Sequence, residues 1–125
     1  MPKLPVHVEE VSPETWYEGT DREIRGRALS DVGGRARVGV GVLELPPGSN
    51  TLPAHYHTHE EEHVYVLDGT LTLHLGEQTY RLGPGGYVCF PASQAVPHHL
   101  SNDGRVTVRY LMIGERNEAD QVVYP

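Results

Sequence analysis

The histidines and carboxylates between residues 55 and 63 have the residue types and spacing of a metal site. Four of the eight histidines, His55, His57, His59 and His63, fall within nine residues, beside three consecutive glutamates at positions 60–62. Imidazole and carboxylate together are ligands for a borderline or hard divalent metal ion. The cluster therefore predicts metal chemistry at this point of the chain.

The spacing of His55 and His57 favours a strand over a helix. On a strand, residues i and i+2 point to the same side with their Cα atoms roughly 6.5 Å apart, so two imidazoles can reach one ion at about 2.1 Å. Pro53 disfavours a helix just upstream, and residues 64–67 (Val-Tyr-Val-Leu) are typical of a strand. We expect the histidine pair and Glu62 on neighbouring strands.

The elements that would position this cluster are short strands separated by glycine- and proline-containing turns. Asp68-Gly69 predicts a turn that closes a hairpin after Glu62. Ser12-Pro13-Glu14 has the pattern of a helix start, so a short helix is expected through Tyr17. The expected strands are 4–11, 36–43, 64–67, 70–75, 79–82, 87–90, 96–100 and 105–113, with a loop at 30–34 and a tail, 122–124, that folds back. This pattern predicts an all-β sandwich or barrel, and a small barrel encloses a pocket for a small ligand.

Composition and charge narrow the classes of function. The 125 residues predict one domain, and a net charge of −7 with a pI near 5.5 argues against nucleic acid and anionic membrane surfaces as partners. The chain contains no apolar run of about 20 residues and does not begin with an apolar signal segment, so we expect a cytoplasmic protein and no membrane partner. Cys89 is the single cysteine, which excludes an intrachain disulfide.

Residues 48–102 resemble the two motifs of the cupin superfamily. The first motif, G-x5-H-x-H-x(3,4)-E-x6-G, matches Gly48, His55, His57, Glu62 and Gly69, with one extra residue after Gly48. The second, a glycine/proline turn followed by H-x3-N, matches the segment that ends in His98 and Asn102. Gly86 stands where many relatives carry an acidic residue. The flanks resemble a group of small single-domain cupins (cupin_2 type), some of which carry mannose-6-phosphate isomerase-like labels.

The resemblance implies a double-stranded β-helix (jelly-roll) barrel with a short N-terminal helix, formed by residues 1–125 as a single domain. It also implies that His55, His57, Glu62 and His98 bind one divalent metal ion inside the barrel. Only the resemblance selects His98 over His99, although strand alternation agrees that at most one of the two faces inward. The residues alone leave Glu61 open as a ligand in place of Glu62 or beside it, and the six-residue gap to Gly69 favours Glu62.

Other polar residues are expected to have lesser roles. His59 lies in the turn between the ligand strands, which predicts a rim position. His63 and Tyr65 alternate away from Glu62, toward solvent or a partner sheet. Arg109 or Tyr110 could point into the pocket, depending on strand register. Three residues are expected to be structural or surface residues: His7, His74 and Cys89.

A three-histidine, one-carboxylate site in an octahedral metal leaves two open positions, which is typical of a catalytic site. We therefore expect a metal-dependent enzyme of isomerase or dioxygenase type, acting on a small oxygenated molecule with Zn, Mn, Fe or Ni. The alternative is a non-catalytic metal-containing module that binds or senses a small molecule. We also expect a homodimer, because strand faces that point away from the pocket need cover.

Overall fold

A computed structural model of the chain describes residues 5–32 and 36–125. The expected strand at 4–11 and the expected loop at 30–34 therefore fall partly outside the described residues. Nearly all regular structure is β-strand, in agreement with the expected fold class. The elements are η1 (Val8–Glu10), β1 (Glu14–Trp16), β2 (Ile24–Ala28), η2 (Leu29–Asp31), β3 (Val38–Leu45), β4 (Tyr56–His57), β5 (Glu62–Asp68), β6 (Leu71–Leu75), β7 (Gln78–Leu82), β8 (Tyr87–Phe90), β9 (His98–Ser101), β10 (Val108–Glu115) and β11 (Val122–Val123).

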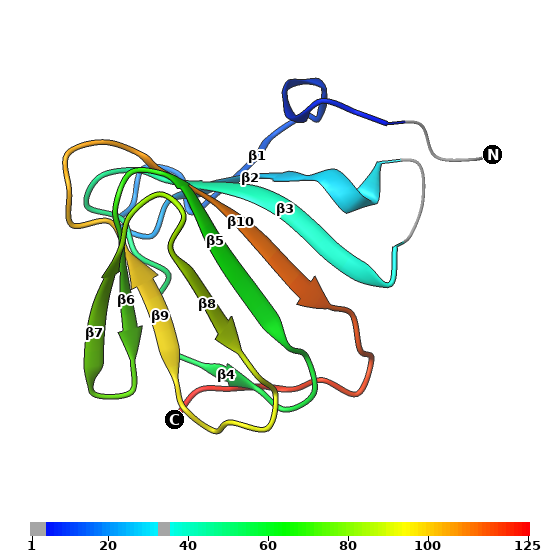
Figure 1. Cartoon of the computed structure of the whole chain (residues 1–125), viewed down its shortest axis with the longest axis vertical. Helices are drawn as coiled ribbons and strands as arrows, with labels where there is room; N and C mark the ends of the chain where they lie inside the picture. The colour runs from blue at the N-terminus through cyan, green and yellow to red at the C-terminus, as the bar shows by residue number, and fades with distance from the viewer. Residues whose placement is uncertain (1–4, 33–35) are drawn as a thin grey trace.

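Two main antiparallel sheets form the walls of the barrel. The larger has the order β1-β2-β3-β10-β5-β8, the smaller has the order β7-β6-β9, and β4 pairs with β11. In Figure 1 the two walls approach each other at the top and separate below, where β4 and the C-terminus lie across the lower end. No helix among the described residues is long and apolar enough to cross a membrane.

The hydrophobic core fills the space between the two sheets. Alternate residues of β5 and β10 point into it, among them Val64, Val66 and Tyr110, each at most 1% exposed. The smaller sheet contributes Leu71, Leu73 and Leu100 to the same cluster. Because the period of a strand is two, Glu62 and Met112 fall on this inner side as well. The inner positions at the lower end of the larger sheet thus continue the core toward the polar cluster.

The N-terminal region differs from the sequence-based expectation. Residues 12–17 do not form a helix, because Glu14–Trp16 pairs with β2 as an edge strand, and the one short helix nearby is the single 3-10 turn at Val8–Glu10. That turn also replaces part of the expected strand at 4–11. The pairing is favoured because the Trp16 ring packs against Gly26, where an added Cβ would lie 3.0 Å from the ring. Tertiary packing outweighs the local helix-start signal here.

The Asp68-Gly69 turn is present, but it does not close a hydrogen-bonded hairpin. Gly69 has a φ of +79°, and the chain passes from β5 in the larger sheet to β6 in the smaller one. The histidine pair and Glu62 are likewise not on neighbouring strands, because β4 pairs with β11 whereas β5 lies between β10 and β8. The expected ligands therefore approach one another across the barrel interior rather than along one sheet.

β2 (Ile24–Ala28) was not among the expected strands, and the remaining strands agree with the sequence pattern. β8 has the expected bounds, β3 and β10 begin two or three residues later than expected, and β11 folds back on β4 as expected of the tail. The absent acidic residue at Gly86 has a steric reason. An added Cβ there would lie 2.9 Å from both the Gly83 carbonyl oxygen and Leu82 Cβ, so the turn before β8 has no room for a side chain.

Candidate metal centre

Backbone pairing brings the histidines of the two motifs together. The His98 amide donates to the His55 carbonyl oxygen at 2.9 Å, and the His55 amide donates to that of His98 at 3.2 Å. The His98 ring stacks on Phe90 with 3.7 Å between ring centroids. His55 is thereby fixed beside the start of β9, and the core fixes the orientation of the His98 ring.

Glu62 joins these histidines from the opposite wall. Its Oε1 atom lies 3.1 Å from His57 Nε2 and 3.6 Å from His98 Nε2. Donor atoms of His55, Glu62 and His98 all lie within 4.8 Å of one another. His57 reaches the same carboxylate, and its ring centroid is 5.2 Å from that of His55. The four residues selected from the sequence thus converge on one region inside the barrel.

The donor atoms fit a divalent cation. His55 Nδ1 donates to the Pro53 carbonyl oxygen at 3.1 Å and His57 Nδ1 donates to Asp120 at 2.7 Å, so both rings turn Nε2 toward Glu62. His57 Nε2 is buried and has no hydrogen-bond partner in the described structure, because its 3.1 Å approach to Glu62 lacks hydrogen-bond geometry. A buried nitrogen without a partner is costly unless a cation accepts its lone pair.

The charges of the cluster shift its pKa values in opposite directions. Burial, reinforced by the neighbouring His98 and His57, lowers the pKa of His55. Burial also acts to lower the pKa of His57, but the hydrogen bond to Asp120 and the charge of Glu62 outweigh it and raise the pKa. The pKa of Glu62 is lowered because the hydrogen bond with His98 and the charge of His57 outweigh the effect of burial. Glu62 is therefore anionic at neutral pH.

Asp120 and Glu60 also lie beside His57, although only Glu60 belongs to the cluster singled out from the sequence, where it had no assigned role. Asp120 Oδ2 accepts from His57, and its Oδ1 accepts from the backbone amides of His59 and Glu60, both at 2.9 Å. These bonds outweigh burial and lower the pKa of Asp120 to about 2. Glu60 Oε1 lies 3.8 Å from His57 Nδ1, and its Oε2 accepts from the Asn117 amide at 2.9 Å. Asp120 lies outside both motifs, and Glu60 occupies a position of the first motif to which no role is assigned.

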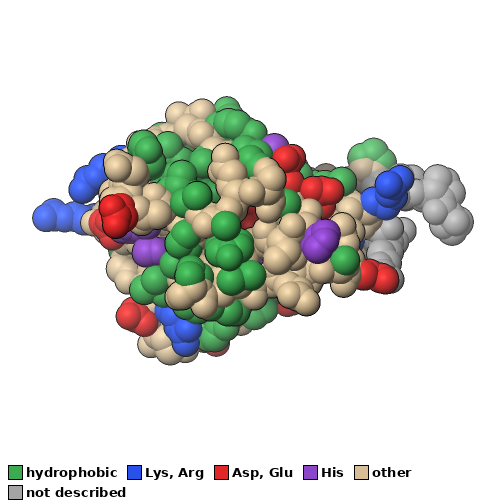
Figure 2. Space-filling view, turned by 90° about the horizontal axis from the view of Figure 1, so that it is seen from below, with side chains coloured by type: hydrophobic (Ala, Val, Ile, Leu, Met, Phe, Trp, Pro, Cys, Tyr) green, Lys and Arg blue, Asp and Glu red, His purple; other side chains and the backbone are tan. Residues whose placement is uncertain are grey.

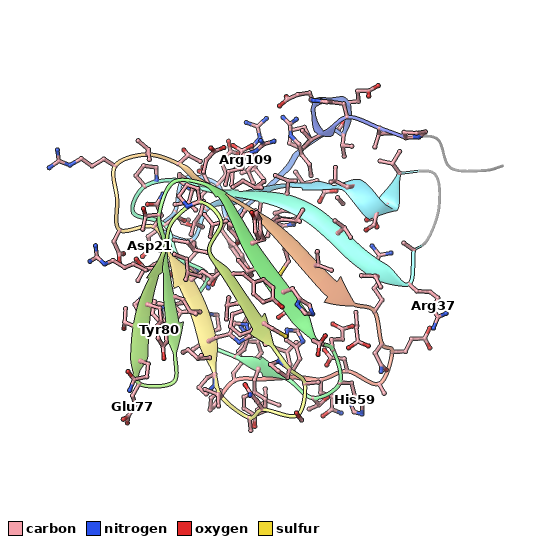
Figure 3. All side chains as sticks on the ribbon, in the orientation of Figure 1. Asp21, Arg37, His59, Glu77, Tyr80 and Arg109 are labelled. Carbon is pink, nitrogen blue, oxygen red and sulfur yellow. The ribbon has the colours of Figure 1, made fainter. Side chains whose placement is uncertain are left out.

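Other residues lie where strand alternation predicts. Glu61 points away from the histidine cluster and pairs with His63 on the outer side of the larger sheet. Tyr110 is fully buried inside the barrel, where burial and the charge of Glu62 raise its pKa. Arg109 lies near the upper end, far from the cluster, and His59 is exposed in the loop at the lower end (Figure 3).

The motif asparagine has a structural role in this barrel. Asn102 is 1% exposed, and its Nδ2 donates to the carbonyl oxygens of Leu45 and Val106, both at 2.8 Å. Its backbone carbonyl accepts from the amide of Gly48, the first residue of the first motif. The ends of the two motifs are thus joined at a distance from the histidine cluster.

A cavity of about 280 Å³ adjoins the cluster on the inner side of the larger sheet. Its walls are mainly apolar and include Trp16, Leu43, Met112, Gly39, Gly41 and Gly114. Gly114 also marks the boundary with the ligands, because a Cβ added there would lie 3.7 Å from Glu62 Cγ. Glu60 is the carboxylate that lines both the cavity and the surroundings of His57. The cavity therefore ends beside the metal-ligand cluster.

The lower end of the barrel has an apolar surface. Figure 2 shows hydrophobic side chains gathered in the middle of this end. Val96, Val122 and Tyr124 are between 39% and 61% exposed, and the Tyr124 ring lies 6.0 Å from that of His55. These segments cover the histidine cluster from below.

A family model described as the cupin domain matches residues 41–114, more than half of the chain. The chain belongs to the cupin family. The match includes Glu62 and all three histidines of the cluster. This membership agrees with the all-β barrel and with the two sequence motifs.

Solved structures of other cupins resemble this one over almost its whole length. A protein described provisionally as a sugar phosphate isomerase, from Acidithiobacillus ferrooxidans, is 33% identical with a TM-score of 0.86, over 98% of this chain and 81% of its own. The polyketide cyclase RemF from Streptomyces resistomycificus is 27% identical with a TM-score of 0.79, over 98% and 86%. A sugar phosphate isomerase from Silicibacter pomeroyi, at 23% identity and a TM-score of 0.87 over 98% and 82%, supports the fold alone. No curated protein matches the chain.

Proposed function

We propose that this cupin is a metal-dependent enzyme that moves a proton next to a carbonyl group of a small, largely apolar substrate. The observation that carries the proposal is the position of Glu60, whose carboxylate lines the cavity and lies 3.8 Å from Nδ1 of His57, the nearest expected ligand to it. A carboxylate at this place supplies the proton acceptor that an isomerase or cyclase needs and that a simple binding site does not.

His55, His57, Glu62 and His98 would hold one divalent ion, with Zn, Mn, Fe and Ni as candidates. Such an ion acts as a Lewis acid that polarises a carbonyl oxygen of the substrate. Asp120 keeps the proton of His57 on Nδ1 and so directs Nε2 toward the ion. Glu62 and Asp120 are both anionic at neutral pH, which favours a cation between the histidines.

Glu60 would accept the proton from the carbon next to the carbonyl group. Its Oε2 atom is held by the Asn117 amide, which fixes the carboxylate at the cavity wall. The apolar lining of the cavity excludes water from the substrate and strengthens interactions with developing charge. The same carboxylate can return the proton to the former carbonyl carbon while the proton of the neighbouring hydroxyl passes to the former carbonyl oxygen, which completes an isomerisation. Alternatively, the carbanion can attack a second carbonyl carbon of the substrate, whose oxygen then takes the proton from Glu60, which completes a ring closure.

The charged groups of the cavity favour an apolar carbonyl compound over a phosphorylated sugar. Arg27 pairs with Glu9 at 3.0 Å, and Arg116 pairs with Asp31 and donates to the Ala36 carbonyl oxygen. Each arginine of the lining is thus paired with a carboxylate, so neither presents an unneutralised charge to a phosphate. Of the sugar phosphate isomerase and the polyketide cyclase named above, the cyclase has a description that fits this cavity better.

The proposal can be tested by proton exchange in deuterium oxide. Metal-loaded protein should accelerate loss of the α-proton NMR signal of 2-hydroxyacetophenone, and do so more than for dihydroxyacetone phosphate. Glu60→Gln should lower the exchange rate about 10² to 10⁴-fold while metal content stays unchanged. Faster exchange of the phosphate would contradict the substrate class. No exchange with either compound would contradict catalysis and leave the non-catalytic binding module.

We also propose that the chain forms a homodimer through the outer side of the larger sheet. Tyr65 on β5 and Tyr87 on β8 are 44% and 56% exposed there, and Leu111 and Ile113 of β10 are only partly covered. Apolar side chains on one face of a sheet gain stability when a second copy covers them. Light scattering at micromolar concentration should give twice the mass of the chain, and a monomer would contradict this proposal.

A further inference from the structure

A second group of metal-binding side chains lies on the opposite side of the larger sheet from the histidine cluster. It consists of Glu61, His63 and Cys89, whose donor atoms all lie within 4.8 Å of one another. His63 and Cys89 are directly paired residues of β5 and β8, which lie side by side in Figure 1. Glu61 immediately precedes β5, and its carboxylate reaches His63 at 2.8 Å. Strand register therefore fixes His63 and Cys89, and the contact with His63 places Glu61 beside them.

We propose that Glu61, His63 and Cys89 form a second metal site, which takes a thiophilic divalent cation such as Zn²⁺. His63 Nε2 lies 2.8 Å from Glu61 Oε2 and 3.8 Å from Cys89 Sγ. In a tetrahedral zinc site with bonds near 2.1 Å, neighbouring donor atoms are about 3.4 Å apart. The three side chains need only small rotations to reach that arrangement, and a water molecule completes the coordination.

The ring of His63 is already oriented for this role. Without metal, Nε2–H donates to the Glu61 carboxylate at 2.8 Å. When a metal ion replaces that proton, the Tyr87 hydroxyl, 2.6 Å from Nδ1, can accept a hydrogen bond from Nδ1–H and leave Nε2 as the ligand atom. A hydrogen bond at the second nitrogen is the usual way in which a metal-binding histidine is held in one tautomer. Tyr87 therefore acts as the positioning residue of the site.

The two sites differ in the metal ions that they favour. The inner cluster offers three imidazoles and one carboxylate, whereas the outer one offers a thiolate, an imidazole and a carboxylate. Sulfur selects softer ions, and two anionic ligands neutralise a dication at a face that is partly exposed in the single chain, where the side chains of His63 and Glu61 are 31% and 43% exposed. This is also the face through which we propose the homodimer to form, so the bound ion would lie at the edge of or within that contact. Binding releases the Cys89 thiol proton to solvent as the S–Zn bond forms.

Cobalt titration tests the outer site separately from the inner one. Because Cys89 is the single cysteine of the chain, a thiolate-to-cobalt charge-transfer band in the near ultraviolet can arise only from this residue. Metal-free wild-type protein, kept reduced with a phosphine, should develop this band and bind one more equivalent of Co²⁺ than the Cys89→Ser variant. Excess Zn²⁺ should abolish the band.

The matched variants distinguish this proposal from the proposed function. His98→Ala should keep the thiolate band while losing the inner equivalent, and Cys89→Ser should lose the band while keeping the inner equivalent. Tyr87→Phe should weaken Co²⁺ binding at the outer site about tenfold or more without changing the stoichiometry. Wild-type protein that shows no thiolate band at two equivalents of Co²⁺, or Cys89→Ser protein that binds as much metal as wild type, would overturn the proposal.

Discussion

Replacement of Asp120 by asparagine should weaken metal binding without removing any ligand. Asp120 Oδ2 accepts from His57 Nδ1 at 2.7 Å, and the two side chains are only 8% and 12% exposed. Asparagine keeps the shape but removes the negative charge and thus the charge-assisted bond. Loss of such a partner typically costs 10- to 100-fold in metal affinity, or about 1.4 to 2.8 kcal/mol.

The affinity is measured by competition with a chromophoric chelator, with Zn²⁺ or Mn²⁺, at neutral pH. Glu77→Gln is the matched control, because it removes one carboxylate charge at the exposed tip of the β6–β7 hairpin (Figure 3). We expect the metal Kd to rise 10- to 100-fold in Asp120→Asn and less than twofold in Glu77→Gln. Equal affinities of the two variants would refute the role of Asp120, and thermal unfolding of the metal-free proteins shows whether the C-terminal segment remains docked.

Three further predictions follow from the same contacts. The pKa of Asp120 falls from 3.8 to about 2 on folding, so its contribution to stability is present above pH 4 and is lost as the pH falls toward 2. Urea titrations over this range should therefore show that acid lowers the free energy of unfolding of Asp120→Asn less than that of wild type. Equal dependence on pH in the two proteins would contradict the shift. Asn102→Ala should lower the free energy of unfolding by about 2–4 kcal/mol, because two buried carbonyl groups lose their donor. The metal content should stay unchanged, and loss of the metal would mean that Asn102 belongs to the site. Gly114→Val should raise the Kd for 2-hydroxyacetophenone, measured by calorimetry, about tenfold with unchanged metal content. Gly83→Val, in the turn before β8, should leave this Kd unchanged. Equal effects of the two substitutions on the Kd would contradict the position of the cavity.

The sequence predicts the barrel well because most strands are bounded by glycine and proline residues, which favour turns and interrupt regular structure. The glycine and proline positions before β8 and the alternation in β3 and β10 each indicate a strand. They do not give the inner side of β3, where Leu43 and Leu45 face the core and the alternating Val40 and Val42 face outward. The sequence fails at residues 12–17, where the local pattern indicates a helix. The strand there depends on contact between Trp16 and Gly26, which are ten residues apart and meet only after β2 has paired.

The candidate site, like the fold, could be predicted only in part from the sequence. Residue types and strand spacing select His55 and His57 and leave Glu61 open beside Glu62, whereas only the resemblance to the cupin motifs selects His98 over His99. Asp120 cannot be found in this way, because it lies 63 residues beyond His57 and reaches it only when β11 folds back on β4. The role of Glu60 depends on the cavity beside it, and the pairing of Cys89 with His63 depends on the register between β5 and β8.

Metal content per chain tests the central claim most directly. Wild-type protein and the His98→Ala and Cys89→Ser variants should be purified without chelators or a histidine tag, reconstituted with Mn²⁺ or Fe²⁺, and compared by elemental analysis. We predict close to one equivalent of these harder ions in wild type and in Cys89→Ser, and its loss in His98→Ala with the barrel still folded. No bound metal in reconstituted wild type, or full retention in His98→Ala, would contradict a metal centre formed by His55, His57, Glu62 and His98.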